Sequence, residues 1–129
     1  MNAKTEKVMT LIHKAEKDYK ASKVLLETDD CDYHCDSICF HCQQCVEKSL
    51  KAFLMYNETP FPKTHDLLIL LHLCSGLDSR FNDFDLSEFA GFGVDIRYDD
   101  PSPSMGETRR AFEMAKIVMN YVRGRIEPE

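Results

Sequence analysis

The sequence predicts an all-α fold, an up-and-down antiparallel bundle of four long helices plus one short helix. Three observations support this fold class. Apolar residues recur at spacings of three and four along long stretches, which is the pattern of amphipathic helices. The chain holds only five Gly and five Pro among 129 residues, which favours long regular elements. Short connections between the periodic stretches favour antiparallel neighbours.

Length and charge narrow the class of protein. At 129 residues the chain suits one domain, which we expect to span residues 1–129. The net charge is −6 and no run of Lys or Arg stands out, so we do not expect a nucleic-acid partner. No apolar run approaches the ~20 residues of a membrane span, and the first 20 residues lack a signal peptide's apolar segment. We therefore expect a cytoplasmic protein without membrane contact.

The first two predicted helices span residues 5–27 and 32–56. The first carries an apolar stripe on one side and Lys and Glu on the other. The members of this stripe are Val8, Leu11, Ile12, Ala15, Tyr19, Leu25 and Leu26, with Ser22 in the remaining position. Residues 57–63 cannot continue the second helix, because Pro60 and Pro62 remove backbone donors and favour extended backbone.

The third predicted helix spans residues 65–75, with Thr64 as its N-cap and Gly76 just after its end. Leucines lie on almost every side of it, so we expect the helix to be well buried. These leucines are Leu67, Leu68, Leu70, Leu71 and Leu73.

The last third of the chain predicts a short helix at residues 86–89 and a final long helix. Ser104 opens the final helix, with Glu107 three residues later in a capping box. The apolar stripe of this helix ends near Gly124.

Five cysteines follow one side of the second helix and its leading edge: Cys31, Cys35, Cys39, Cys42 and Cys45. In a reducing compartment, cysteines are better interpreted as free thiols, metal ligands or catalytic groups than as disulfides. Neighbours one turn apart lie ~6 Å from each other, so a Zn²⁺ ion with bonds of ~2.3 Å could use two at most. His13, His34, His72 or Cys74 would have to complete such a shell. We therefore predict that the stripe is a core seam and not a metal site.

The opposite side of the same helix is polar. His41, Gln44, Lys48 and Lys51 follow one another at spacings of three and four and so form one patch, with Glu47 beside them and Gln43 near the border. One interpretation is a solvated helix face. The other is a recognition surface, because imidazole and amide groups suit base edges or phosphate.

Three motifs in this order resemble the HEPN family of small prokaryotic helical proteins. Residues 39–54 read CFHCQQCVEKSLKAFL, which is similar to the family's signature helix. Thr-His-Asp-Leu at residues 64–67 resembles a following family segment, and Arg-Tyr-Asp-Asp at residues 97–100 resembles a third. Together with the final helix, the resemblance covers nearly the whole chain.

The resemblance implies an antiparallel bundle, often a homodimer, similar to the C-terminal domain of kanamycin nucleotidyltransferase. Family members often work beside a minimal nucleotidyltransferase and are proposed to bind nucleotides. One branch comprises metal-independent RNases, toxins among them, marked by Arg, then four to six residues, then His. That motif is absent here, because the last histidine is His72 and the first arginine is Arg80.

The resemblance also implies a set of ligand-binding residues: His41, Gln44, Lys48, His65, Arg97 and Tyr98. Arg97 can bind phosphate as a fork, Lys48 can add a charge, and Tyr98 can stack on a base. Purely structural roles stay open. His65 could cap its helix or bond Asp66, Tyr98 could be a core or dimer contact, and Arg97 could pair with Asp99, Asp100 or Glu88.

Three hypotheses for the function follow from the sequence. The first is a homodimeric module that binds a small nucleotide, or the substrate end of a minimal nucleotidyltransferase partner, without catalytic residues or a further cofactor. The second is an RNase in which His41 or His65 acts as acid or base and Arg97 stabilises the phosphorane. The third is a structural adaptor whose polar face lines a helical interface.

Overall fold

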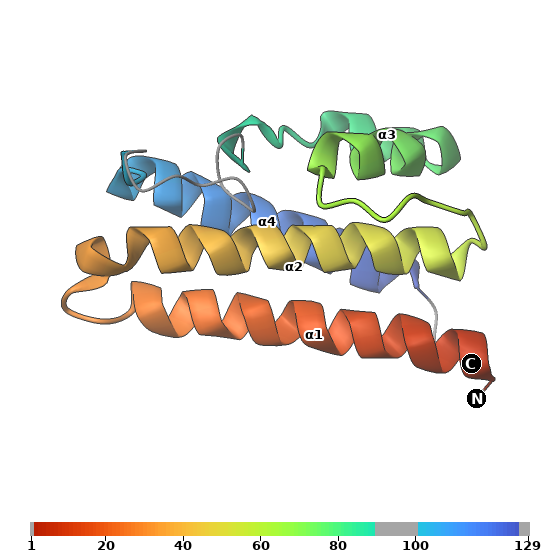
Figure 1. Ribbon diagram of the computed structural model, residues 1–129, viewed down its shortest axis with the longest axis horizontal. Coiled ribbons are helices and arrows are strands. Elements are labelled where there is room, and N and C mark those ends of the chain that lie inside the picture. The colour runs from red at the N-terminus through yellow and green to blue at the C-terminus, as the bar shows by residue number, and fades with distance from the viewer. Residues whose placement is uncertain (1, 90–100, 127–129) are drawn as a thin grey trace.

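In the described residues the protein has four α-helices, and three of them pack around the second, central helix (Figure 1). The computed structural model describes residues 2–89 and 101–126. The helices are α1 (Ala3–Leu26), α2 (Cys35–Tyr56), α3 (Leu67–Leu77) and α4 (Met105–Arg125). Three 3-10 turns accompany them: η1 (Cys31–His34), η2 (Ser79–Asp83) and η3 (Ser87–Phe89). This part of the chain holds no strand, so the predicted all-α class is confirmed, as is a short helical turn near residues 86–89.

Helix α2 lies between α1 and α4, and specific contacts fix their directions. Cys35 approaches Met105 and Cys39 approaches Thr108, so α2 and α4 run in the same direction. On α1 the order is reversed, because Tyr19 stacks on Phe112 while the earlier Glu16 pairs with the later Arg123. Helix α1 is therefore antiparallel to both α2 and α4, as Figure 1 shows.

Helix α3 departs from the expected up-and-down order. Residues 57–66 double back along α2, so that His65 meets Glu47 near the middle of that helix. Further along the chain, the Cys74 Sγ atom lies 3.6 Å from the Leu50 carbonyl oxygen. The ring centroids of Phe81 and Phe53 are 4.7 Å apart. Helix α3 thus advances in the same direction as α2 (Figure 1). A returning segment of this length replaces the tight turn that antiparallel neighbours would require.

The bounds of α3 also differ from the prediction. The N-cap is Asp66 and not Thr64, because the Asp66 carboxylate accepts from the backbone N–H of Leu68. The Thr64 hydroxyl oxygen instead accepts from the backbone N–H of Asp66, which leaves His65 before the helix. At the other end the helix continues through Gly76 to Leu77.

The expectation that α3 is well buried is wrong. Only one side of the helix packs on the core, through Leu67, Leu70 and Cys74. Leu68 is 65% exposed and Ile69 is 43% exposed. Among the described residues α3 packs mainly on α2 and η2, and Leu71 and Leu73 are partly buried against the core. Leu68 and Leu77 have no described helix to cover them.

The other helix termini agree closely with the sequence. The capping box at Ser104 and Glu107 is present, with both reciprocal hydrogen bonds at 3.0 Å. The predicted start of the second helix is a 3-10 turn, and regular α-helix begins at Cys35. In the part of the chain that is described, no helix combines the length and the apolar character needed to cross a membrane.

The cysteine stripe is part of the hydrophobic core, as predicted. Cys39, Cys42 and Cys45 are at most 1% exposed, and they share the core with small residues such as Ala15 of α1 and Ala111 of α4. Burial raises the pKa of Cys39 to about 11 and that of Cys42 and Cys45 to about 12. These thiols therefore stay protonated at neutral pH and pack as small apolar groups. Cys31 differs, because it lies half-buried in η1.

This burial predicts the reactivity of the six thiols. At neutral pH we expect a disulfide reagent such as DTNB to modify about one thiol per chain quickly, because Cys31 is accessible and the other five are buried. Unfolding in guanidinium should release all six. The Cys31→Ser variant should lose the fast phase. Rapid modification of several thiols in the native chain would contradict the packing.

Candidate functional site

Asp18 of α1 holds two residues of α2 with its two carboxylate oxygens. Its side chain is only 13% exposed. The Lys48 ammonium donates to one oxygen at 2.6 Å, and His41 Nδ1 lies 2.9 Å from the other. His41 and Lys48 are seven residues apart, two turns along the same side of a helix. One acidic side chain thus ties α1 to α2 and fixes two of the predicted ligand residues.

Glu47 makes a second cluster of the same kind. Its side chain is 5% exposed, and one of its oxygens accepts a hydrogen bond from the Lys51 ammonium at 3.1 Å. His65 Nδ1 lies 3.0 Å from the other oxygen. Because His65 directly precedes the cap of α3, this contact brings the start of α3 onto the polar side of α2.

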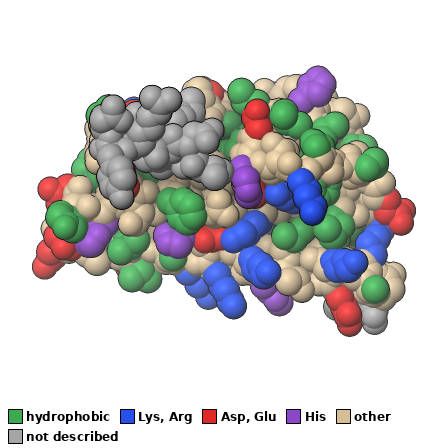
Figure 2. Space-filling view, in the orientation of Figure 1, with side chains coloured by type: hydrophobic (Ala, Val, Ile, Leu, Met, Phe, Trp, Pro, Cys, Tyr) green, Lys and Arg blue, Asp and Glu red, His purple; other side chains and the backbone are tan. Residues whose placement is uncertain are grey.

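We call these residues together the polar face: Asp18, His41, Gln44, Glu47, Lys48, Lys51 and His65. Figure 2 shows histidine, acidic and basic side chains gathered over α1 and α2 on this side of the molecule. Gln44 is half-buried, and helix geometry puts it one turn from both His41 and Lys48.

The two carboxylates determine how the imidazoles can act. An ionised carboxylate only accepts hydrogen bonds, so in both clusters the ring must donate from Nδ1. The other ring nitrogen, Nε2, has no partner among the described residues for either His41 or His65. Each histidine is therefore held by one nitrogen and can offer the other to a ligand, as an acceptor when neutral and as a donor when protonated.

Gln43 adds a buried amide next to the polar face. It is 4% exposed, and its side-chain oxygen has no hydrogen-bond partner within residues 2–89 and 101–126. It lies one turn before Glu47, on the same side of α2. An unpaired buried amide costs free energy of folding.

The other residues predicted from the sequence have different outcomes. Arg97 and Tyr98 lie outside the described residues. Glu88, which the sequence offered as a partner for Arg97, instead pairs with Arg110 at 2.6 Å. His65 bonds Glu47 rather than Asp66, whose carboxylate caps α3.

The sequence placed Glu47 beside the polar patch but did not predict that it would hold His65 and Lys51, and it gave no role to Asp18. Glu47 stands inside the signature motif, so its position was a signal that could have been used. Asp18 has no such signal, because α1 carries several acidic residues and only its register against α2 selects this one. No group of three or more His, Cys, Asp and Glu side chains in the described residues is arranged to hold a metal ion.

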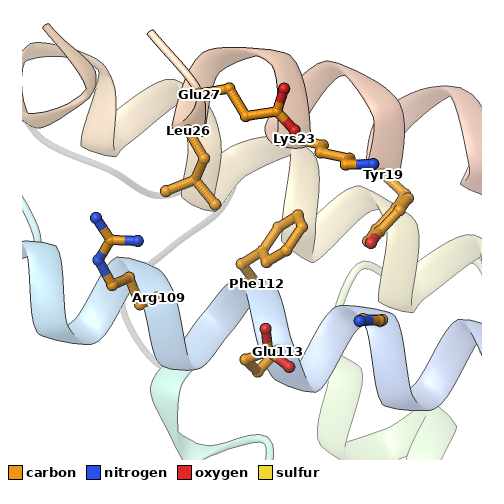
Figure 3. A pocket seen from close by; sticks show the side chains of 8 residues that line it. Tyr19, Lys23, Leu26, Glu27, Arg109, Phe112 and Glu113 are labelled. Carbon is orange, nitrogen blue, oxygen red and sulfur yellow. The ribbon is translucent and has the colours of Figure 1, made fainter. Parts of the chain in front are cut away.

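The structure also contains a groove away from the polar face. It has a volume of about 470 Å³ and lies between α1 and α4 (Figure 3). None of the described ligand residues predicted from the sequence lines it.

The family resemblance of the sequence and the helical bundle both agree with a comparison of the sequence with protein families. The model of the HEPN domain matches residues 8–125. The chain belongs to the HEPN family. A relative from Methanocaldococcus jannaschii, named "Putative toxin MJ1304", is 48% identical over 46 residues. That match covers 36% of this chain and 28% of the relative, so it spans little more than a quarter of that protein.

The HEPN fold is also seen in a solved structure. The crystal structure of ST0689, an archaeal HEPN homologue, superimposes with a TM-score of 0.64. The match covers 93% of this chain and 98% of that one, at 19% sequence identity. Such a distant likeness concerns the fold alone.

Asp18 should contribute measurably to the stability of this HEPN chain. The Asp18→Asn variant keeps the shape but weakens the bonds to His41 and Lys48, so we expect a loss of about 1–3 kcal/mol in the free energy of unfolding. Urea denaturation measures it. Asp29→Asn, an exposed site in the α1–α2 connection, should stay within about 0.5 kcal/mol of the parent protein. Equal stability of the two variants would show that Asp18 is not the anchor.

Proposed function

We propose that this HEPN chain is a non-catalytic module that binds a nucleotide through its polar face. The observation that carries the proposal is the pair of carboxylate-held histidines, His41 and His65, whose Nε2 atoms are left for a ligand. His41 belongs to α2 and His65 to the segment that precedes α3, and the two histidines lie in the same clusters as Lys48 and Lys51. Phosphate oxygens accept from imidazolium and ammonium groups, and the amide of Gln44 suits the edge of a base.

The charge balance of the polar face suggests that it binds a phosphate group with moderate affinity. Asp18 and Glu47 offset the charges of Lys48 and Lys51, so with neutral imidazoles the polar face carries no net charge. Protonation of His41 and His65 makes it positive. A phosphate-bearing ligand would favour that protonated state and so draw the two histidines into binding.

The partners belong to the same proposal. We propose that the chain acts in the cytoplasm as a homodimer beside a minimal nucleotidyltransferase, whose nucleotide substrate the polar face would present. Neither a membrane nor a nucleic acid is part of this account.

Nucleotide binding should raise the melting temperature. At ten times Kd, ATP or GTP should stabilise the fold by about 1.4 kcal/mol, a shift of a few degrees. Lys48→Gln should reduce this ligand-induced shift, whereas Lys7→Gln, an exposed position on α1, should not. Differential scanning fluorimetry measures both shifts. A folded protein that shows no shift at millimolar nucleotide, or an equal shift in Lys48→Gln, would refute the proposal.

An RNase is the second candidate, and one observation favours it. A histidine whose Nδ1 is held by a carboxylate is oriented for proton transfer at Nε2, and the polar face holds two. The relative named as a toxin is in keeping with this candidate. The absence of an Arg before any His still places it second.

Incubation with total RNA separates the two candidates. The binding proposal predicts that RNA stays intact when it is incubated with the protein at the concentrations used to measure nucleotide binding. Cleavage that disappears in both His41→Ala and His65→Ala, and persists in the exposed-site control His72→Ala, would make the RNase the better account.

A further inference from the structure

We propose that the groove between α1 and α4 is a second binding site, for a flat aromatic anion of mononucleotide size. It is independent of the polar face, and nothing in the proposed function uses it. The groove is lined by Tyr19, Lys23, Leu26, Glu27, Arg109, Phe112, Glu113 and Lys116. In Figure 3, Phe112 and Arg109 extend from α4 toward α1.

The floor of the groove is aromatic. The rings of Tyr19 and Phe112 stack, with centroids 5.1 Å apart and an angle of 17° between their planes. Both side chains are half-buried against the core, so their positions are fixed by packing, and Leu26 lies beside them. A planar ring entering the groove would meet aromatic surface that is already held in place.

The rim of the groove is charged. Lys23, Arg109 and Lys116 form no ion pair with a described residue, whereas Lys48 and Lys51 on the polar face are each bonded to a carboxylate. An anion in the groove therefore need not displace an existing partner. Glu27 and Glu113 also line the groove. These two carboxylates repel an anion that comes close to them, but they can accept hydrogen bonds from amino groups on a ring.

The size of the groove suits such a ligand. Its volume of about 470 Å³ lies within the range of small-molecule sites, about 300–1,000 Å³. Three cations against two carboxylates give a net formal charge of +1. A ring on the aromatic floor with a phosphate toward the rim satisfies both features, and a nucleoside monophosphate combines them in one molecule.

The chain offers a matched pair of variants for the test. Arg109 and Arg110 are both exposed and adjacent on α4, but only Arg109 lines the groove, and Arg110 pairs with Glu88. Arg109→Gln should weaken AMP binding by about tenfold, because it removes a charge-assisted hydrogen bond. Arg110→Gln should leave the Kd unchanged. Isothermal titration calorimetry with the full chain gives these values.

Two further probes separate the ring from the charge. Adenosine should bind more weakly than AMP, and inorganic phosphate more weakly still. Phe112→Leu keeps the groove filled but removes the stacked ring, so it should reduce the affinity for adenosine. Chemical shifts induced by AMP should fall on α1 and α4.

Three results would overturn the proposal. One is a folded protein that does not bind millimolar AMP. Another is AMP affinity that Arg109→Gln and Phe112→Leu leave unchanged. The third is AMP binding that Lys48→Gln abolishes while Arg109→Gln has no effect, which would leave the polar face as the nucleotide site and remove the groove.

Discussion

Two carboxylates that lie largely out of water determine how the polar side of this molecule is built. An ionised carboxylate in such a place is costly unless donors surround it. Asp18 meets this requirement with His41 and Lys48, and Glu47 meets it with Lys51 and His65. The same bonds join α1 to α2 and the start of α3 to α2. Helix docking and side-chain orientation therefore depend on one set of contacts.

Helix α2 can serve both as core and as functional surface because its two sides differ in chemistry. Thiols and alanine are small, so α1 and α4 pack closely on the inner side around Cys42 and Ala52. Because the cysteines and alanines occupy the inner side of α2, helical periodicity puts the residues between them, His41 and Lys48 included, on the outer side. Protonated thiols add no charge to the core, since burial raises the pKa of Cys42 to about 12.

Local patterns predicted much of this structure, and tertiary contacts decided the rest. The stripe of α1 and the capping box at Ser104 depend on near neighbours in the chain, so the sequence could reveal them. The spacing of His41 and Lys48 likewise indicated a shared helix side. The return of residues 57–66 along α2 and the exposure of Leu68 depend on which helices are neighbours, which periodicity does not specify. The role of Asp18 could not be predicted, because it depends on the register of α1 against α2.

The protonated nitrogen of each histidine tests the account most directly. Long-range ¹H–¹⁵N NMR on the imidazole rings distinguishes the two neutral tautomers. The carboxylates should hold His41 and His65 in the Nδ1–H form, whereas the exposed His13 and His72, which have no ring partner among the described residues, should favour the Nε2–H form usual in water. If His41 and His65 instead show the same tautomer as His13 and His72, the carboxylates do not organise the polar face and the proposed binding site loses its basis.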